Sequence, residues 1–280
     1  PTQYRRSFYM YDYVGGRYSS TSMVGLVTLG FFLGYEQVLE FIEGASNMDY
    51  LCEEPDIRVN QALLLALLGI WNHCYLDMPT LAVLPYSQAL HRFPAHLQQL
   101  DMESNGKSID RQAKSINFRS GPVVWGEVGT NGQHAFFQLL HQGTETVPCE
   151  FIGFRRSQYG KDMEVDGTTS QQKLVANMLA QSVALARGQD SDNPNRVFPG
   201  NRPSSVLLGE RLTPSVMGAL LALYEAKVVF QGFAWNINSF DQEGVQLGKV
   251  LAGRFLGEMG ADRDSGDVLA RFMLETTGTL

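Results

Sequence analysis

The stretch VVWGEVGTNGQHAFFQLLHQGTETVPCEFIG, from Val123 to Gly153, decides the fold class. It begins with a strand-like run at Val123–Trp125, continues with helical apolar spacing over Gln133–His141, and ends with a second strand-like run at Val147–Gly153. Strands that alternate with helices build a largely parallel sheet whose two faces are covered by helices. The stretch therefore predicts an α/β layered fold.

The same alternation continues along the rest of the chain. We predict further strands at Leu81–Leu84 and Val206–Leu208. We predict further helices at Thr21–Leu33, Glu36–Ala45, Val59–Tyr75, Gln88–Leu100, Gln171–Ala186, Pro214–Asn236 and Gln242–Phe255. The segment from Ala186 to Ser205 is rich in Asn, Asp, Gly and Pro, which predicts an exposed loop. The pattern contains no internal repeat.

Composition limits the possible partners. The chain has 280 residues, 44% of them hydrophobic, which suffices for one big domain or two modest ones. The longest uninterrupted apolar run, Ala62–Trp71, is far shorter than the roughly 20 residues that span a bilayer. The net charge is −7 and no Lys/Arg cluster occurs, so no nucleic-acid backbone is expected as a partner. We expect no membrane partner either.

The cysteines and the N-terminal residues indicate the compartment of the protein and whether its chain is cut. Cys52, Cys74 and Cys149 show no paired spacing, which argues for a reducing compartment, and we expect a cytoplasmic protein. The opening residues PTQYRRSFYMYDY have neither an initiator methionine nor the apolar core of a secretory leader. A cut chain is therefore expected.

Two polar side chains share one side of a predicted helix in INSFDQEGVQLGK, Ile237 to Lys249. Gln242 and Lys249 are seven residues apart, about two helical turns, so both point the same way. Such a pair can hold a sugar hydroxyl or carbonyl oxygen. On spacing alone, a solvated amphipathic helix explains the pair better.

Arg17 and Glu103 lie in motifs with both functional and structural interpretations. Arg17 follows two glycines and precedes a Ser/Thr cluster, a spot that suits a developing anion or simply a turn before a helix N-cap. Glu103 lies in DMESNGK, where we expect an extended approach ending in a turn that exposes the carboxylate at a cleft. The structural alternative is a solvated glutamate at a helix end.

The histidines suggest proton transfer more than metal binding. His134 lies at the start of a predicted helix, and imidazole groups exchange protons near neutral pH. A lone histidine is nevertheless more often structural. His91 and His96 are not at i, i+4 spacing, and His134 and His141 lack further ligands nearby. We predict no metal.

Four blocks in a fixed order carry a resemblance to a known family. They are DYVGGRYSSTSMVG, QQLDMESNGK, GPVVWGEVGTNGQHAFFQLLHQGT and INSFDQEGVQLGK. Together they resemble glucose-6-phosphate isomerase (phosphoglucose isomerase), and four ordered blocks are far more specific than one. The resemblance implies a three-layer α-β-α sandwich of the sugar-isomerase (SIS) type. Residues 1–35 would end the smaller sugar-phosphate-binding domain, and residues 36–280 would form the larger domain.

The resemblance also implies an activity and its residues. The family interconverts glucose 6-phosphate and fructose 6-phosphate by ring opening and proton transfer through an enediolate, without a cofactor. Glu103 matches the base and Arg17 the residue that stabilises the enediolate. Lys249 and His134 both match residues that help ring opening. His134 would enter the site from the partner subunit of a homodimer. The substrate contacts would be Gly16, Gln99 and Gln242.

The resemblance covers roughly the C-terminal half of family chains. The family's Ser/Thr-rich loop that holds the substrate phosphate lies in the other half, so weak or no activity is expected of this chain alone. Glu243 and Gln246 depart from the family pattern, which we interpret as altered helix packing or surface charge. Two alternatives stay open: a non-catalytic folded fragment or dimerisation domain of that enzyme, and a sugar-phosphate-binding regulatory module.

Overall fold

The structure, a computed structural model, describes residues 5–259 and 267–279. Pro1, where the sequence suggests a cut chain, lies outside the described residues. The described residues fall into two compact units, and the chain passes from the first to the second between Ser239 and Phe240. The boundary expected near Tyr35 stays a prediction.

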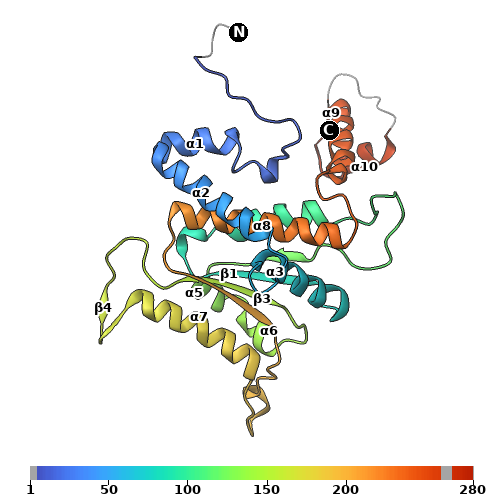
Figure 1. Cartoon of the computed structure of the whole chain (residues 1–280). Helices are drawn as coiled ribbons and strands as arrows, with labels where there is room; N and C mark the ends of the chain where they lie inside the picture. Colours follow the sequence, from blue (N-terminus) through green and yellow to red (C-terminus); the bar gives the residue numbers. More distant parts are fainter. Residues whose placement is uncertain (1–4, 260–266, 280) are drawn as a thin grey trace. The chain divides into compact units, whose positions relative to one another are not determined.

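A parallel sheet lies at the centre of the first unit. Among the described residues it has four strands in the order β2 (Val123–Trp125), β1 (Thr80–Pro85), β3 (Cys149–Phe154) and β6 (Ser204–Gly209). All three pairings are parallel. These strands coincide with the four predicted from the sequence, and Figure 1 shows the sheet between two groups of helices.

Successive side chains of the strands point to opposite faces of the sheet and start two separate cores. On one face, Val83 and Ile152 pack with Leu220 and Tyr224. On the other face, Leu84 packs with residues such as Phe151, Met178 and Leu185. The predicted α-β-α sandwich is confirmed.

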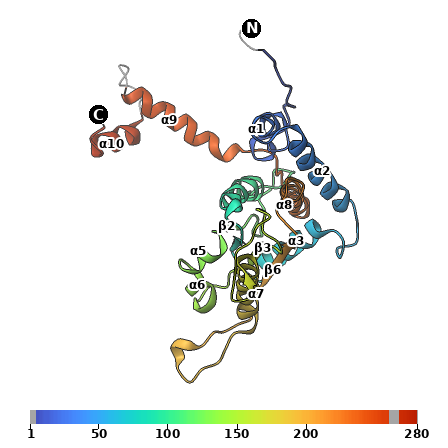
Figure 2. The same ribbon diagram turned by 90° about the vertical axis from the view of Figure 1, so that its left-hand side faces the viewer.

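The first core is covered by α2 (Tyr35–Cys52), α3 (Gln61–Ile70), α4 (Phe93–Leu97) and α8 (Pro214–Ala234). The second is covered by α5 (Gly129–Gln133), α6 (Phe137–Gln142) and α7 (Ser170–Arg187). Figure 2 shows α7 and α8 on opposite sides of the strands. The helical layers therefore come from segments far apart in the sequence.

Helix α8 is the longest helix that the structure describes and is central to the first core. Thr213 caps it by accepting a hydrogen bond from the Val216 amide, and Pro214 starts its first turn. Among the described helices, α8 alone is long and apolar enough to cross a membrane, yet 56% of that stretch is buried inside the protein. Buried Lys227 and Gln231 lie on it, as in the core helix of a globular fold.

Several predicted helices are interrupted. Gln88–Leu100 is wrong as one helix, because it divides into η3 (Gln88–Leu90), α4 and a π-helical segment η4 (Gln98–Glu103). Gln133–His141 is also wrong as one helix, since α5 ends at Gln133 and α6 begins at Phe137. The predicted helix Val59–Tyr75 ends in a π-helical segment, η2 (Trp71–Tyr75).

Some described elements were not predicted. These are the short hairpin of β4 (Glu164–Val165) and β5 (Thr168–Thr169), and the turn η5 (Pro194–Arg196) inside the expected loop. The second unit contains η6 (Glu243–Val245), α9 (Gln246–Met259) and the unpredicted α10 (Val268–Thr276).

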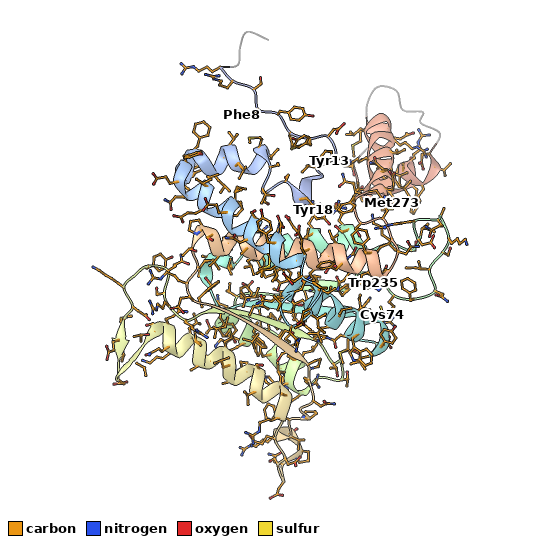
Figure 3. The ribbon with its side chains drawn as sticks, viewed as in Figure 1. Phe8, Tyr13, Tyr18, Cys74, Trp235 and Met273 are labelled. Carbon is orange, nitrogen blue, oxygen red and sulfur yellow. The ribbon has the colours of Figure 1, made fainter. Side chains whose placement is uncertain are left out.

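The N-terminal segment of the first unit exposes aromatic side chains. Phe8 and Tyr13 are largely exposed on the extended stretch that precedes η1 (Gly16–Tyr18) (Figure 3). Helix α1 (Met23–Leu33) follows, and none of its residues is buried. The segment therefore contacts the first core mainly through Tyr18, Leu26 and Leu29.

Candidate functional site

Arg17 lies on the short turn η1, ahead of α1. Ser22 accepts a hydrogen bond from the Val24 amide at 3.3 Å and so caps α1, as the Ser/Thr cluster predicted. Gly16 opens the turn and is exposed, and a methyl group on it would meet no atom within 4 Å. The backbone at Gly16 is thus open to a ligand.

The Arg17 guanidinium is buried and held at all three nitrogens. Its side chain is 1% exposed. Nε donates to Ser104 Oγ at 2.7 Å, and Nη2 donates to the Ser239 carbonyl oxygen at 2.6 Å. Nη1 lies 3.4 Å from Glu103 Oε2. The structure therefore brings Arg17 and Glu103 together across 86 residues of sequence.

Glu103 is the last residue of the π-helical segment η4, and its side chain is 26% exposed. The expected extended approach is wrong, because the segment continues helically from α4 through η4. Gln99 Nε2, four residues earlier, donates to Glu103 Oε2 at 3.3 Å. Glu103 Oε2 thus contacts both the Arg17 guanidinium and the Gln99 side-chain amide. Segments of π-helix often occur at functional sites.

The expected exposed turn at Ser104–Gly106 is also different in the structure. Ser104 and Asn105 are fully buried and point inward. Asn105 Oδ1 accepts a hydrogen bond from Ser239 Oγ at 2.7 Å, and Asn105 Nδ2 donates to the Val228 carbonyl oxygen at 3.0 Å. Glu103 is therefore followed by a buried segment whose side chains are hydrogen-bonded within the protein.

Tyr18 completes this cluster. Its hydroxyl oxygen lies 2.8 Å from Ser104 Oγ, and its ring centre lies 5.4 Å from the carbon at the centre of the Arg17 guanidinium. Burial raises the pKa of Tyr18, so the hydroxyl stays protonated at neutral pH. Sequence reasoning missed Tyr18, Ser104 and Ser239, and only the adjacency of Tyr18 to Arg17 gave a signal.

An open depression adjoins the carboxylate. It is lined by Gln98, Gln99, Met102 and Glu103 of η4 and by the three residues of β2. Glu103 and Gln99 are therefore accessible from the solvent side, while Arg17 supports Glu103 from the interior. This geometry suits transfer of a proton beside a fixed positive charge.

His134 lies between α5 and α6, and its side chain is exposed. Gln133 anchors the preceding turn, because its Nε2 donates to Tyr86 Oη at 2.7 Å and also contacts Asn177 Oδ1. His134 does not line the depression at Glu103, and its imidazole has no hydrogen bond with any residue that the structure describes. Within this chain, His134 is thus not brought to the carboxylate.

Gln242 and Lys249 belong to the second unit. Gln242 directly precedes η6, and Lys249 lies on α9. Both residues are exposed. Their expected roles stay predictions. Across residues 5–259 and 267–279, no three His, Cys, Asp or Glu side chains gather as metal ligands would.

A second buried polar cluster lies on the first-core side of the sheet. Lys227 Nζ donates to Glu150 Oε1 at 2.8 Å, and Tyr224 Oη donates to Glu150 Oε2 at 2.7 Å. Burial raises the pKa of Asp101, a fully buried residue of η4, to about 6, and nearby Lys227 opposes the shift. The lone lysine and glutamine within apolar α8 were a sequence signal for this cluster.

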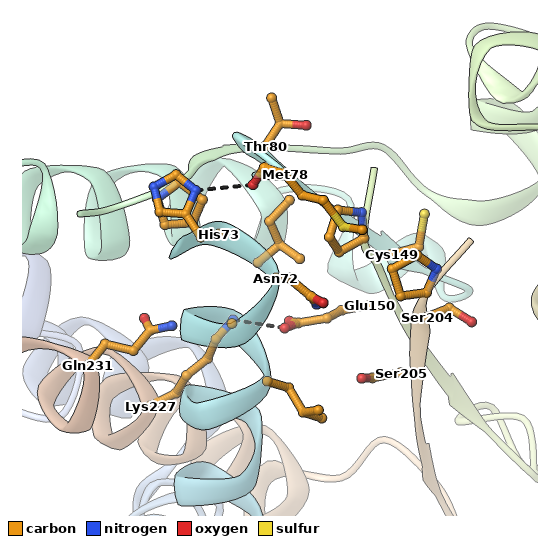
Figure 4. A pocket seen from close by; sticks show the side chains of 16 residues that line it. Asn72, His73, Met78, Thr80, Cys149, Glu150, Ser204, Ser205, Lys227 and Gln231 are labelled. Atoms are coloured by element: carbon orange, nitrogen blue, oxygen red, sulfur yellow. Dashed lines mark hydrogen bonds and ion pairs between the residues drawn. The ribbon is translucent and has the colours of Figure 1, made fainter. Parts of the chain in front are cut away.

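A cavity of about 110 Å³ lies beside this pair. Figure 4 shows side chains that line it, among them both members of the pair. Its walls include Thr80, Cys149 and Ser204, which lie at the amino ends of their strands. Gln231 also lines it, and its Oε1 has no hydrogen-bond partner among the described residues. The cavity is separate from the depression at Glu103, since the two share no lining residue.

The fold and the Arg17–Glu103 pair define an α/β protein with a site suited to proton transfer next to a developing negative charge. A family model described as phosphoglucose isomerase matches residues 3–270. The chain therefore belongs to the phosphoglucose isomerase family.

Similar curated proteins include two bacterial glucose-6-phosphate isomerases. The one from Desulfotalea psychrophila is 64% identical over 264 residues, and the one from Protochlamydia amoebophila is 58% identical over 261 residues. These matches cover 94% and 93% of this chain, but 49% of each relative. The chain thus spans about half the length of the curated relatives it matches, as the family resemblance implied.

Solved structures agree with the fold. A crystal structure of a glucose-6-phosphate isomerase from Chlamydia trachomatis matches with a TM-score of 0.92 at 54% identity, over 97% of this chain and 52% of that chain. A hypothetical protein from Thermus thermophilus matches with a TM-score of 0.72 at 27% identity, over 87% of this chain and 55% of that chain.

Proposed function

We propose that this chain is the C-terminal half of an enzyme that interconverts glucose 6-phosphate and fructose 6-phosphate. The observation that carries the proposal is the Arg17–Glu103 pair, 3.4 Å apart, with Glu103 at an open depression. The similar proteins with this printed name support the choice of substrate. The whole enzyme would also contain the half that binds the substrate phosphate.

Glu103 is the base in this proposal. Its carboxylate takes the proton from the carbon beside the carbonyl of the opened sugar and returns it to the neighbouring carbon. One base suffices because the two carbons are adjacent. Gln99 contacts Glu103 Oε2 at 3.3 Å and orients the carboxylate at the edge of the depression. A fixed orientation lowers the entropic cost of each proton transfer.

Arg17 stabilises the enediolate formed between these two transfers. The oxygen of this intermediate carries negative charge, which a fixed guanidinium offsets without reorganising. Arg17 is held at three nitrogens and is 1% exposed, so water does not screen its charge strongly. Gly16, exposed in the same turn, offers its backbone to the substrate.

Ring opening is assigned to His134 and Lys249, and Gln242 contacts the substrate. The exposure of His134, away from Glu103 in its own chain, supports a homodimer in which His134 enters the partner's site. No cofactor is needed, because the reaction moves protons without net oxidation. We place the enzyme in the cytoplasm, with residues 1–35 ending the smaller domain and residues 36–280 forming the larger one.

The test is a coupled assay that converts fructose 6-phosphate to glucose 6-phosphate. It compares the full-length protein with this chain alone, each with and without Glu103→Gln. Activity in the full-length wild type, and its loss in Glu103→Gln, supports the proposal. An inactive full-length wild type, or full activity in Glu103→Gln, would contradict the proposed function. Activity of this chain alone would show that the missing half is dispensable.

A further inference from the structure

We infer that Ser104 is a positioning residue that fixes the Arg17 guanidinium for its role at the site. The inference rests on the proposed function and adds a residue to which neither the sequence motifs nor the comparisons give a role. Ser104 touches no substrate in this assignment. It acts through Arg17, because Ser104 Oγ accepts a hydrogen bond from Arg17 Nε at 2.7 Å.

The first step of the argument is geometric. A guanidinium is planar, so partners at Nε, Nη1 and Nη2 fix both its position and its plane. Two consecutive residues at the end of η4 supply two of these partners, and Ser239 supplies the third. Glu103 Oε2 lies 3.4 Å from Nη1, and Ser104 Oγ accepts from Nε. The Ser239 carbonyl oxygen accepts from Nη2, and the Ser239 hydroxyl in turn donates to Asn105 Oδ1. The segment that carries the base thus also orients the cation.

The second step concerns the Ser104 hydroxyl itself. It is fully buried, so water does not compete for it. Tyr18 Oη lies 2.8 Å away and fixes its direction, while the Tyr18 ring lies 5.4 Å from the centre of the guanidinium. Tyr18 therefore supports Arg17 both directly and through Ser104.

The third step is energetic. An arginine side chain loses rotamer entropy when it is immobilised. If the fold immobilises Arg17 beforehand, this cost does not fall on the reaction step, which is the general advantage of preorganised charge. The 3.4 Å contact with Glu103 is long, so the shorter bond to Ser104 contributes more to the fixed orientation.

The experiment uses the full-length protein and the same coupled assay. Removing a direct stabilising donor typically lowers kcat about 10²–10³-fold. Because Ser104 acts indirectly, Ser104→Ala is expected to lower kcat by about tenfold or more while KM changes by less than about threefold. The matched control is Ser182→Ala on α7, which removes a 2.8 Å hydroxyl contact with Ser204 of β6. Its kcat should equal that of the wild type.

A double-mutant cycle separates positioning from general stability. In an Arg17→Met background, Ser104→Ala should lower kcat no further, because the group it positions is gone. A merely structural role would give the same loss in both backgrounds. Should Ser104→Ala fail to fold, Tyr18→Phe keeps the ring and removes only the hydroxyl that fixes Ser104. Tyr18→Phe should then lower kcat severalfold, with the same dependence on Arg17.

The outcomes are distinguishable. If the wild type is active and Glu103→Gln is not, a normal kcat in Ser104→Ala, or equal losses with and without Arg17, overturns the positioning role alone. If Ser104→Ala does not fold, a normal kcat in Tyr18→Phe does the same. If the full-length wild type is inactive, the proposed function falls, and the positioning role falls with it.

Discussion

Lys227 and Glu150 form an ion pair at 2.8 Å in the interior, with side chains only 1% and 7% exposed. Glu150 lies on β3 in the centre of the sheet, and Lys227 reaches it from α8. The Tyr224 hydroxyl satisfies the second carboxylate oxygen of Glu150. The pair thus joins the longest described helix to the middle of the sheet.

Removing one partner of this pair should destabilise the fold strongly. Glu150→Ala leaves the Lys227 charge buried without a partner, which typically costs about 3–5 kcal/mol. The expected result is a large fall in the urea midpoint of unfolding at pH 7. The double variant Glu150→Leu/Lys227→Met leaves no buried charge and should lose less stability than Glu150→Ala.

The matched control is a surface pair. Arg156 Nε lies 2.7 Å from Glu210 Oε1, and both side chains are more than half exposed. Exposed pairs contribute about 0–1 kcal/mol, so Glu210→Gln should barely move the midpoint. Equal effects of Glu150→Ala and Glu210→Gln would contradict the stabilising role of the buried pair.

Asp101 should make stability fall as the pH rises. Burial raises its pKa from 3.8 to about 6 in the folded protein, so the folded state holds a proton that the unfolded state has released. The stabilising proton is fully present below about pH 4 and is lost as the pH passes about 6. The shift corresponds to a loss on the order of 3 kcal/mol across this window.

The measurement is urea unfolding of the wild type and Asp101→Asn from pH 4 to pH 8. Asp101→Asn should gain stability relative to the wild type as the pH rises. Burial also raises the pKa of Glu225 to about 7, which gives a decline of the same sign in both proteins. The Asp101 contribution is therefore the difference between the two curves, and parallel curves would rule it out.

The sheet could be predicted from the sequence because its inner strands are buried on both faces. Runs such as Leu81–Leu84 read as continuous apolar segments, and turn residues bound them. The β4–β5 hairpin was missed because its two-residue strands are polar and mostly exposed. Helix α10 left a signal in Asp267, whose side chain caps it ahead of Val268 and Leu269.

The site was only partly predictable. The family blocks pointed to Arg17, Gln99 and Glu103, and the structure brings these three together. The partners Ser104 and Ser239 lie 87 and 222 residues from Arg17, and no local pattern encodes such distant contacts. The π-helical segment η4 could not be predicted either, because the sequence QQLDME fits an ordinary α-helix as well.

Glycines at the contact between α2 and α8 should resist substitution. A methyl group at Gly218 would lie 1.9 Å from the carbonyl oxygen of Phe41, which would force the two helices apart. Gly218→Ala should therefore lower the free energy of unfolding by about 1–3 kcal/mol, although alanine favours helices.

The control for this prediction is a glycine with open surroundings. Gly30 lies on α1, and a methyl group there meets no atom within 4 Å. Gly30→Ala should leave stability unchanged or raise it by up to about 1 kcal/mol. Thermal unfolding of both variants is the measurement. A stabilised Gly218→Ala would show that α2 and α8 can separate without cost.

Mixing two inactive variants of the full-length protein tests whether His134 acts in the partner's site. Glu103→Gln and His134→Ala homodimers should each be nearly inactive. If His134 crosses the interface, a heterodimer has one site with both changes and one intact site. Random reassociation makes half of the dimers heterodimers, so about a quarter of wild-type activity should return.

The same mixture also tests the alternative, in which His134 acts in the site of its own chain. In that case each site of the heterodimer would contain one of the two changes, and no activity would return. Mixing Glu103→Gln with Arg17→Met is the matched control, because Arg17 and Glu103 meet within one chain at 3.4 Å. No activity should return in this control. Recovery there would mean that the reassociated subunits do not keep Arg17 and Glu103 of one chain in one site.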